Sequence, residues 1–167
     1  MLYFIKYANH IGRRLLNNLV SLNFYFIFLS LAFTNSQSQT LSPEATKVQQ
    51  VIKGTFNAIS DNDCSKLKFF CTPQLLFFEN GNELNMDSLT NAIAVNRTIP
   101  GYLRTNTINY ISTQVNLNTA WSSYYLVSVI NSNGVRKTFS WAQTIILNKI
   151  DGFWKVAVIH STPLQKN

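Results

Sequence analysis

From Arg104 onward, hydrophobic and polar residues alternate with a period of two, which is the pattern of β-strands with one buried face. Two-residue turn signals, Asn133-Gly134 and Asp151-Gly152, interrupt the alternation. Strands joined by such tight turns pair antiparallel. We therefore predict a curled antiparallel meander of four long strands, over residues 105–117, 119–131, 135–149 and 153–162.

Residues 42–70 carry the signals of two helices. Ser42 is a suitable N-cap with Pro43 at the first helical position, and apolar residues at helical spacing follow as far as Ile59. The polar stretch 61–63 ends this amphipathic helix, and Asp63 caps a shorter one over residues 64–70. The long helix therefore has an apolar face that must pack on another element.

A hairpin and a third helix are predicted between these helices and the meander. Residues 74–79 (QLLFFE) form a strand, and Asn80-Gly81 is the tight turn of a β-hairpin that begins with it. Asp87 then caps a helix that reaches about Val95. Helices first and an antiparallel sheet last define an α+β domain whose helices cover one face of the sheet. With 167 residues, one core is expected.

Residues 1–38 have the layout of a secretory signal peptide. Lys6, Arg13 and Arg14 precede an apolar run of residues 19–33, and the polar sequence TNSQSQT follows. The run is shorter than the roughly 20 residues that a membrane-spanning helix needs. We predict cleavage near Ser36 or Ser38 and a secreted or periplasmic protein without membrane attachment. The alternative is an uncleaved N-terminal anchor.

Net charge and residue content restrict the possible partners. Lys6, Arg13 and Arg14 belong to the predicted signal peptide. Without them, 11 of the 14 basic residues remain, against 7 acidic ones, which gives a mild net charge of +4. No stripe of basic and aromatic residues suggests nucleic-acid binding. Residues 41–167 contain one histidine and two cysteines and no nucleotide-binding motif, so we predict no metal site and no cofactor.

Cys64 and Cys71 are the only cysteines. If the segment between them is helical, their Cα atoms lie roughly 10 Å apart, which is too far for a disulfide. We therefore predict two buried thiols, with a disulfide as the alternative if the helix is broken.

The closing segment GFWKVAVIHSTP, residues 152–163, resembles the last strand of the nuclear transport factor 2-like superfamily, within it the SnoaL-like group of small secreted bacterial proteins. The order of the predicted elements over residues 41–163 is also similar to that superfamily. The resemblance implies a cone-shaped, cystatin-like roll, in which N-terminal helices pack in the concave face of a strongly bent antiparallel sheet with a pocket at its open end. It does not imply one function, because the superfamily includes isomerases, dehydratases, cyclases and members without a known reaction.

His160 is the candidate catalytic residue. It shares strand parity with Trp154, so we predict that it faces the helices and the pocket. A catalytic histidine normally needs an orienting carboxylate or hydroxyl, and the strands between residues 105 and 149 contain no carboxylate. We favour a structural histidine, and a hydrogen bond from His160 to a buried carboxylate or tyrosine hydroxyl is the observation that would reverse this preference.

Aromatic residues and one amide are predicted to line the pocket. Gln143 lies among apolar residues on the strand face of Trp141, and the residues expected to join it are Tyr110, Trp121, Tyr125, Trp154 and His160. The same residues are equally typical of an ordinary core.

The predicted function is therefore that of an exported protein that binds a small apolar or amphipathic molecule in an aromatic pocket and has no demonstrable catalytic apparatus. The first alternative is a SnoaL-like isomerase, cyclase or dehydratase that uses His160 for proton transfer. The second is a homodimer or interaction module that uses the outer face of the sheet. Apolar residues such as Leu126, Ile130 and Ile146 would support the second alternative, and a charged outer face would exclude it.

Overall fold

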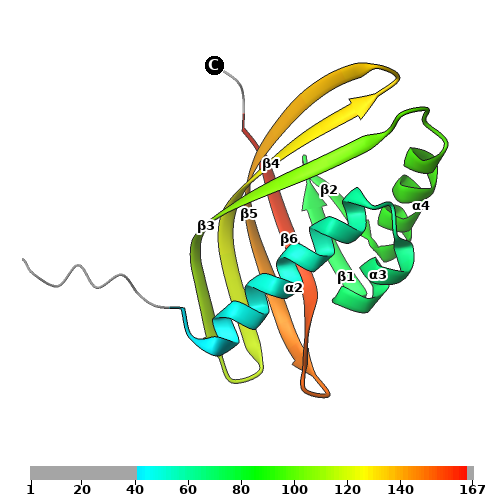
Figure 1. Ribbon diagram of the computed structural model, residues 1–167. Helices are drawn as coiled ribbons and strands as arrows, with labels where there is room; N and C mark the ends of the chain where they lie inside the picture. The colour runs from blue at the N-terminus through cyan, green and yellow to red at the C-terminus, as the bar shows by residue number, and fades with distance from the viewer. Residues whose placement is uncertain (1–40, 165–167) are drawn as a thin grey trace, which may run out of the picture. The chain divides into compact units, whose positions relative to one another are not determined.

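The computed structural model describes residues 41–164, and the predicted signal peptide lies outside them. Three helices and a six-stranded sheet with the strand order β2-β1-β6-β5-β4-β3 make up this part of the chain (Figure 1). In sequence order the elements are α2 (Pro43–Ser60), α3 (Cys64–Phe70), β1 (Cys71–Glu79), β2 (Asn82–Asn85), α4 (Met86–Arg97), β3 (Leu103–Asn116), β4 (Thr119–Ser132), β5 (Val135–Ile150) and β6 (Phe153–Pro163).

The predicted α+β class and the bent sheet with helices on its concave side are confirmed. Helix α2 crosses the concave face of the sheet, while α3 and α4 lie beside β1 and β2 (Figure 1). We call the face that α2 covers the inner face and the opposite one the outer face. None of the helices in residues 41–164 is both long and apolar enough to cross a membrane.

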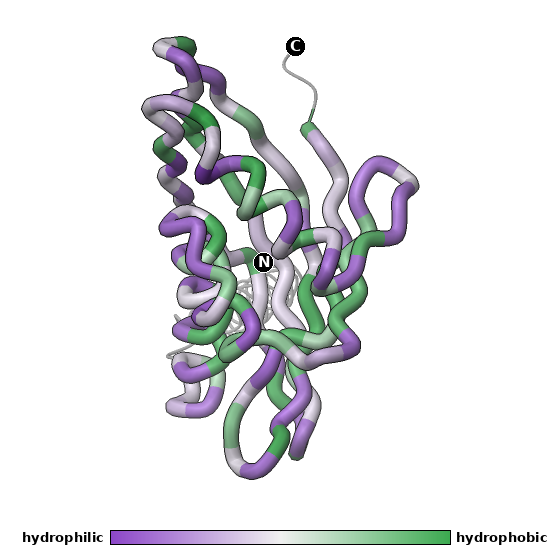
Figure 2. Tube along the Cα trace, turned by 90° about the vertical axis from the view of Figure 1, so that its right-hand side faces the viewer, coloured by the Kyte–Doolittle hydropathy of each residue, from purple (hydrophilic) through white to green (hydrophobic). Residues whose placement is uncertain are grey.

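The apolar face of α2 and the inner face of the sheet form the core. Val48, Ile52 and Phe56 of α2 are buried together with inner-face residues of β4 and β5 such as Leu126 and Leu147. The Phe56 ring packs edge-on against Tyr124, with 6.0 Å between the ring centroids. Hydrophilic residues occupy most of the turns, whereas the strands between them carry hydrophobic ones (Figure 2).

The sequence did not predict that β1 joins the meander. Strand β1 pairs parallel with β6, with Phe77 opposite Ile159 and Glu79 opposite Ser161. All other strand pairs are antiparallel. The parallel pair extends the inner face by one strand and brings a residue from the N-terminal half of the domain next to β6.

Two of the three predicted helix caps are confirmed. The Ser42 hydroxyl accepts a hydrogen bond from the Ala45 amide over 3.1 Å, and Asp63 caps α3. The prediction for α4 was wrong, because Asn85 and not Asp87 is the N-cap and accepts from the Ser88 amide over 2.9 Å. Asp87 instead lies in the first turn, where the positive end of the helix dipole stabilises a carboxylate.

Both cysteines are free thiols. The segment between them is an unbroken helix, which is the condition under which we predicted no disulfide. Cys71 is buried, and burial raises the pKa of its thiol to about 12. Cys64 is only partly buried, contrary to the prediction, because it begins α3 at the edge of the core.

Candidate functional site

Strand register decides which predicted site residues share a face. The turn at Asn133 and Gly134 has exactly two residues, both with positive φ, so Ser132 pairs with Val135. Even-numbered residues of β4 therefore lie opposite odd-numbered residues of β5, as in the pair of Tyr124 and Gln143. The inner face takes the even-numbered residues of β4 and the odd-numbered residues of β5.

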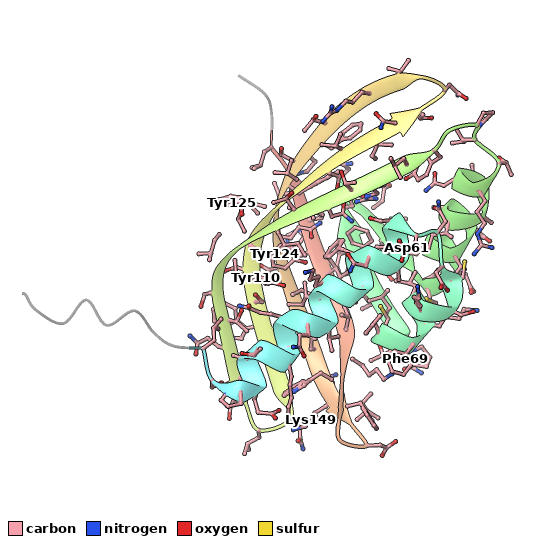
Figure 3. All side chains as sticks on the ribbon, in the orientation of Figure 1. Asp61, Phe69, Tyr110, Tyr124, Tyr125 and Lys149 are labelled. Atoms are coloured by element: carbon pink, nitrogen blue, oxygen red, sulfur yellow. The ribbon has the colours of Figure 1, made fainter. Side chains whose placement is uncertain are left out.

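Two of the predicted pocket residues consequently lie on the wrong face. Trp121 and Tyr125 are odd-numbered residues of β4, point to the outer face and are 43% and 46% exposed. Figure 3 shows Tyr125 on the opposite side of the sheet from Tyr124 and Tyr110. The sequence of one strand shows which of its residues share a face. Which residues of two neighbouring strands share a face depends on the length of the turn between them, and the prediction did not take that length into account.

His160 also lies on the outer face, for a different reason. Leu147 pairs with Val156 and Ile146 with Val158, so Ala157 forms a β-bulge that reverses the parity of the rest of β6. Trp154 is buried on the inner face, whereas His160 is exposed and packs edge-on against Phe78. Among the described residues, no carboxylate or tyrosine hydroxyl hydrogen-bonds to His160, so the condition set for a catalytic role is not met.

The prediction that two apolar residues of β4 face outward was wrong too. Leu126 is buried on the inner face, and Ile130 lies on the same face, opposite Lys137. Ile146 does face outward, as predicted.

Four predicted pocket residues do lie on the inner face: Tyr110, Trp141, Gln143 and Trp154. Trp154 is placed apart from the others near the start of α2, where its indole Nε1 donates to Glu44 Oε2 over 2.9 Å. Trp141 is half-buried and stacks on Phe139, with 5.8 Å between the ring centroids. Whether any of these residues binds a ligand stays a prediction.

The inner face carries a continuous row of polar side chains, one from each of five strands. Cross-strand pairing places them in the order Tyr110, Tyr124, Gln143, Ser161 and Glu79. We call these five residues the polar row. Sequence reasoning had found only Tyr110 and Gln143, and it had placed no carboxylate on this face.

Hydrogen bonds satisfy the polar row only in part. Tyr110 Oη donates to the Gln49 carbonyl over 3.0 Å, and Gln143 Nε2 donates to Ser161 Oγ over 2.9 Å. Tyr124 Oη and Gln143 Oε1 are buried and have no hydrogen-bond partner among the described residues. A buried polar atom without a partner costs free energy, so two of them on paired positions need a physical explanation.

The protonation states of the two tyrosines are fixed by their surroundings. Burial, with a smaller contribution from Tyr110, raises the pKa of Tyr124 well above its ordinary value. Burial raises the pKa of Tyr110 to about 12. Both phenols therefore keep their protons at neutral pH, and the Tyr124 hydroxyl is a donor while Gln143 Oε1 is an acceptor.

A second polar cluster lies nearer the β4–β5 turn and ties the sheet to the end of α2. Asn106 Nδ2 donates to the Phe56 carbonyl over 2.9 Å and to Ser60 Oγ over 2.7 Å. Arg104 donates to Asn106 Oδ1 through Nε and to Ser128 Oγ through Nη2, each over 3.0 Å. We call Arg104, Asn106, Ser128 and Ser60 the Arg104 network.

Cavities border the described residues away from the polar row, and two of them are formed around the helices. One, of about 390 Å³, lies where α3, β1 and the start of α4 meet, beside Lys68 and Met86. The other, of about 440 Å³, lies between the α2–α3 connection and the end of α4 and includes Tyr102. No group of three or more His, Cys, Asp or Glu side chains in residues 41–164 is arranged to hold a metal ion.

Comparison with known proteins identifies the fold. A nuclear transport factor 2-like superfamily protein from Salmonella enterica matches with a TM-score of 0.64 and 14% identity, over 73% of this chain and 92% of that chain. The CaMKII hub homology domain of Chlamydomonas reinhardtii matches with a TM-score of 0.63 and 20% identity, over 73% and 99%. A ketosteroid isomerase-like protein from Erwinia carotovora matches with a TM-score of 0.60 and 14% identity, over 75% and 100%.

The described domain therefore has the nuclear transport factor 2-like fold, as the sequence predicted. No protein-family model and no curated protein matches the sequence. The neighbours include an isomerase-like protein and a hub domain, so the shared fold does not select a function.

Proposed function

We propose that this protein binds a small amphipathic molecule on the inner face of its sheet, against the polar row. The observation that carries the proposal is the pair of unpartnered buried atoms, Tyr124 Oη and Gln143 Oε1, on directly opposite residues. One is a donor and the other an acceptor, so a ligand hydroxyl could satisfy both at once. The surrounding inner-face residues, such as Phe56 and Leu126, are apolar and would contact the rest of the ligand.

A gradient of burial along β5 supports access to this position. Ile145 and Leu147 are fully buried and Gln143 is 5% exposed, but Trp141 is half-buried and Phe139 is 42% exposed. Along β5 the inner face thus becomes more accessible from the polar row toward the β4–β5 turn, whereas Leu126 and Ser128 of β4 stay buried. Stacked Phe139 and Trp141 offer the aromatic surface that an apolar ligand would contact on entry.

Binding of 2-naphthol, followed by its fluorescence, tests the proposal. We expect saturable binding to the wild-type protein and an affinity at least about tenfold lower in the double variant Tyr124→Phe/Gln143→Met, since two hydrogen bonds are lost. Trp121→Ala on the outer face is the matched control and should keep wild-type affinity. Absence of binding, or equal affinity in the double variant, contradicts a site at the polar row.

A second candidate function is self-association through the outer face. Three cross-strand rows on this face contain no Lys, Arg, Asp or Glu, and we call them the outer patch: Gln114, Trp121, Ile146, Val158 and Leu76; Ser112, Ser123, Thr144, His160 and Phe78; Asn109, Tyr125, Ala142 and Thr162. The chain as a whole is cationic, with a net charge of +7. An uncharged face with exposed Trp121 and Tyr125 is where two copies can meet without facing like charges.

Sedimentation velocity over a range of concentrations tests this second candidate. A wild-type dimer that dissociates in Trp121→Glu supports it, since a carboxylate in the middle of an apolar contact would have to be desolvated. Thr105→Glu, an exposed position on β3 outside the outer patch, is the control and should leave the dimer intact. A wild-type monomer at all concentrations rules the candidate out.

Export is the remaining part of the proposal. The basic, apolar and polar succession of residues 1–38 supports it. The mass of the protein recovered from outside the cytoplasm would test it, with a new N-terminus near Ser36 or Ser38 as the expected result. Recovery of the full-length chain in a membrane fraction would favour an uncleaved anchor instead.

A further inference from the structure

We propose that the ligand of the inner face is an organic acid and that Arg104 binds its carboxylate. This inference rests on the proposed function and adds the chemical class of the ligand. It concerns a partly buried residue that lies outside the polar row, on the inner face nearer the β4–β5 turn.

The guanidinium of Arg104 is held in place, with donors left over. Arginine has five N–H donors, and Arg104 uses Nε for Asn106 Oδ1 and one N–H of Nη2 for Ser128 Oγ. Asn106 is itself fixed to α2 through the Phe56 carbonyl and Ser60 Oγ. The end of the guanidinium formed by Nη1 and the second N–H of Nη2 has the fork geometry that receives both oxygens of a carboxylate.

Arg104 has no ionic partner among the described residues. Both side chains that accept its hydrogen bonds are neutral, and none of the ion pairs in this part of the chain includes it. Burial lowers the pKa of Arg104, while electrostatic interaction and hydrogen bonding with Tyr102, and the charge of Glu79, oppose this effect. A desolvated guanidinium whose hydrogen-bond acceptors are neutral is a position that an external anion would stabilise.

The separation between Arg104 and the polar row sets the size of the ligand. The Arg104 side chain reaches Ser128, which lies four residues along β4 from Tyr124. Four strand residues correspond to about 13 Å between Cα atoms. A molecule about 10 Å long could therefore place a hydroxyl between Tyr124 Oη and Gln143 Oε1 and a carboxylate on Arg104, with an aromatic or aliphatic body in between.

Three fused-ring probes separate these contributions in the full-length protein. 6-Hydroxy-2-naphthoate carries both polar ends, 2-naphthol lacks the carboxylate and 2-naphthoate lacks the hydroxyl. We expect 6-hydroxy-2-naphthoate to bind at least about tenfold more tightly than 2-naphthol, as is usual for hydrogen bonds to charged groups. Arg104→Gln should abolish that difference and leave the affinity for 2-naphthol within about twofold.

Arg136→Gln is the control for the overall positive charge, because it removes an equal charge from an exposed position on β5. A preference for the acid that survives Arg104→Gln, or that Arg136→Gln reduces equally, overturns the assignment to Arg104. Binding of 2-naphthol with no preference for the acid overturns this inference and leaves the proposed function standing, whereas binding of none of the probes overturns both.

Arg104→Gln could also unfold the protein, because it breaks the Arg104 network. The probe comparison in the wild type and in Arg104→Lys, which keeps the charge but loses the fork, does not depend on that variant. We expect Arg104→Lys to retain part of the preference for the acid. Equal affinities of the wild type for 6-hydroxy-2-naphthoate and 2-naphthol are by themselves sufficient to reject the inference.

Discussion

Trp154 Nε1 donates a hydrogen bond to Glu44 Oε2 over 2.9 Å, which joins β6 to the first turn of α2 across 110 positions of sequence. The same carboxylate oxygen accepts from Lys149 Nζ over 2.9 Å, and Oε1 accepts from Lys47 Nζ over 2.7 Å. These three donors, from Lys47, Lys149 and Trp154, lower the pKa of Glu44 from 4.5 to about 2.

Stability should therefore depend on the ionisation of Glu44. Its pKa is lower in the folded protein, so its contribution is fully present above about pH 4.5 and is lost as the pH falls toward 2. We expect Glu44→Gln to lower the melting temperature at pH 7 and the difference from wild type to shrink between pH 4.5 and 2. Glu83→Gln, at an exposed position without an ion pair among the described residues, should show neither effect. A gap that stays constant from pH 7 to pH 2 contradicts this role.

Two tyrosines of the polar row should respond oppositely to loss of the hydroxyl. Tyr110→Phe removes the hydrogen bond that the Tyr110 hydroxyl donates to the Gln49 carbonyl. It should lower the free energy of unfolding by about 0.5–1.5 kcal/mol. Tyr124→Phe removes a buried hydroxyl without a partner and should leave stability unchanged or raise it by up to about 1 kcal/mol. Urea unfolding of both variants without ligand provides the comparison. A larger loss for Tyr124→Phe than for Tyr110→Phe would show that the Tyr124 hydroxyl is satisfied in the free protein.

Alanine in place of Gly54 of α2 should be destabilising, although alanine is the better helix former. A Cβ there would overlap with Cζ of Phe70, the last residue of α3, so the ring must move. We expect Gly54→Ala to cost about 1–3 kcal/mol, more than the roughly 1 kcal/mol that alanine gains over glycine in a helix. In a Phe70→Ala background the same change should become stabilising. Denaturant unfolding of the four proteins of this double-mutant cycle measures the sign change, and an equal cost in both backgrounds would contradict the contact.

Local patterns were sufficient to predict the elements of this fold, but not the faces of its strands. Caps such as Ser42 and turns such as Asn133-Gly134 act within a few residues, so the sequence shows them directly. The same two-residue turn also determines the register of β4 and β5, and counting from it would have placed Trp121 and Tyr125 outside and Tyr124 inside.

Two other features of the site had no local signal. The bulge at Ala157 reverses the parity of His160, and neither glycine nor proline marks it in the sequence. Glu79 reaches the inner face because β1 pairs parallel with β6, which is a contact between distant parts of the chain. Both features arise from tertiary packing, so periodicity within one strand could not reveal them.

The three tryptophans are reporters at three different places, and they provide the most direct test of a ligand site at the polar row. Trp141 is half-buried on the inner face next to Gln143, Trp121 is exposed in the outer patch, and the indole of Trp154 is bonded to Glu44. An NMR titration of the indole N–H signals with 6-hydroxy-2-naphthoate is the measurement. We predict that the Trp141 signal shifts and saturates while those of Trp121 and Trp154 stay in place. A saturating shift of Trp121 with no change at Trp141 would place the ligand on the outer face and contradict the proposed function.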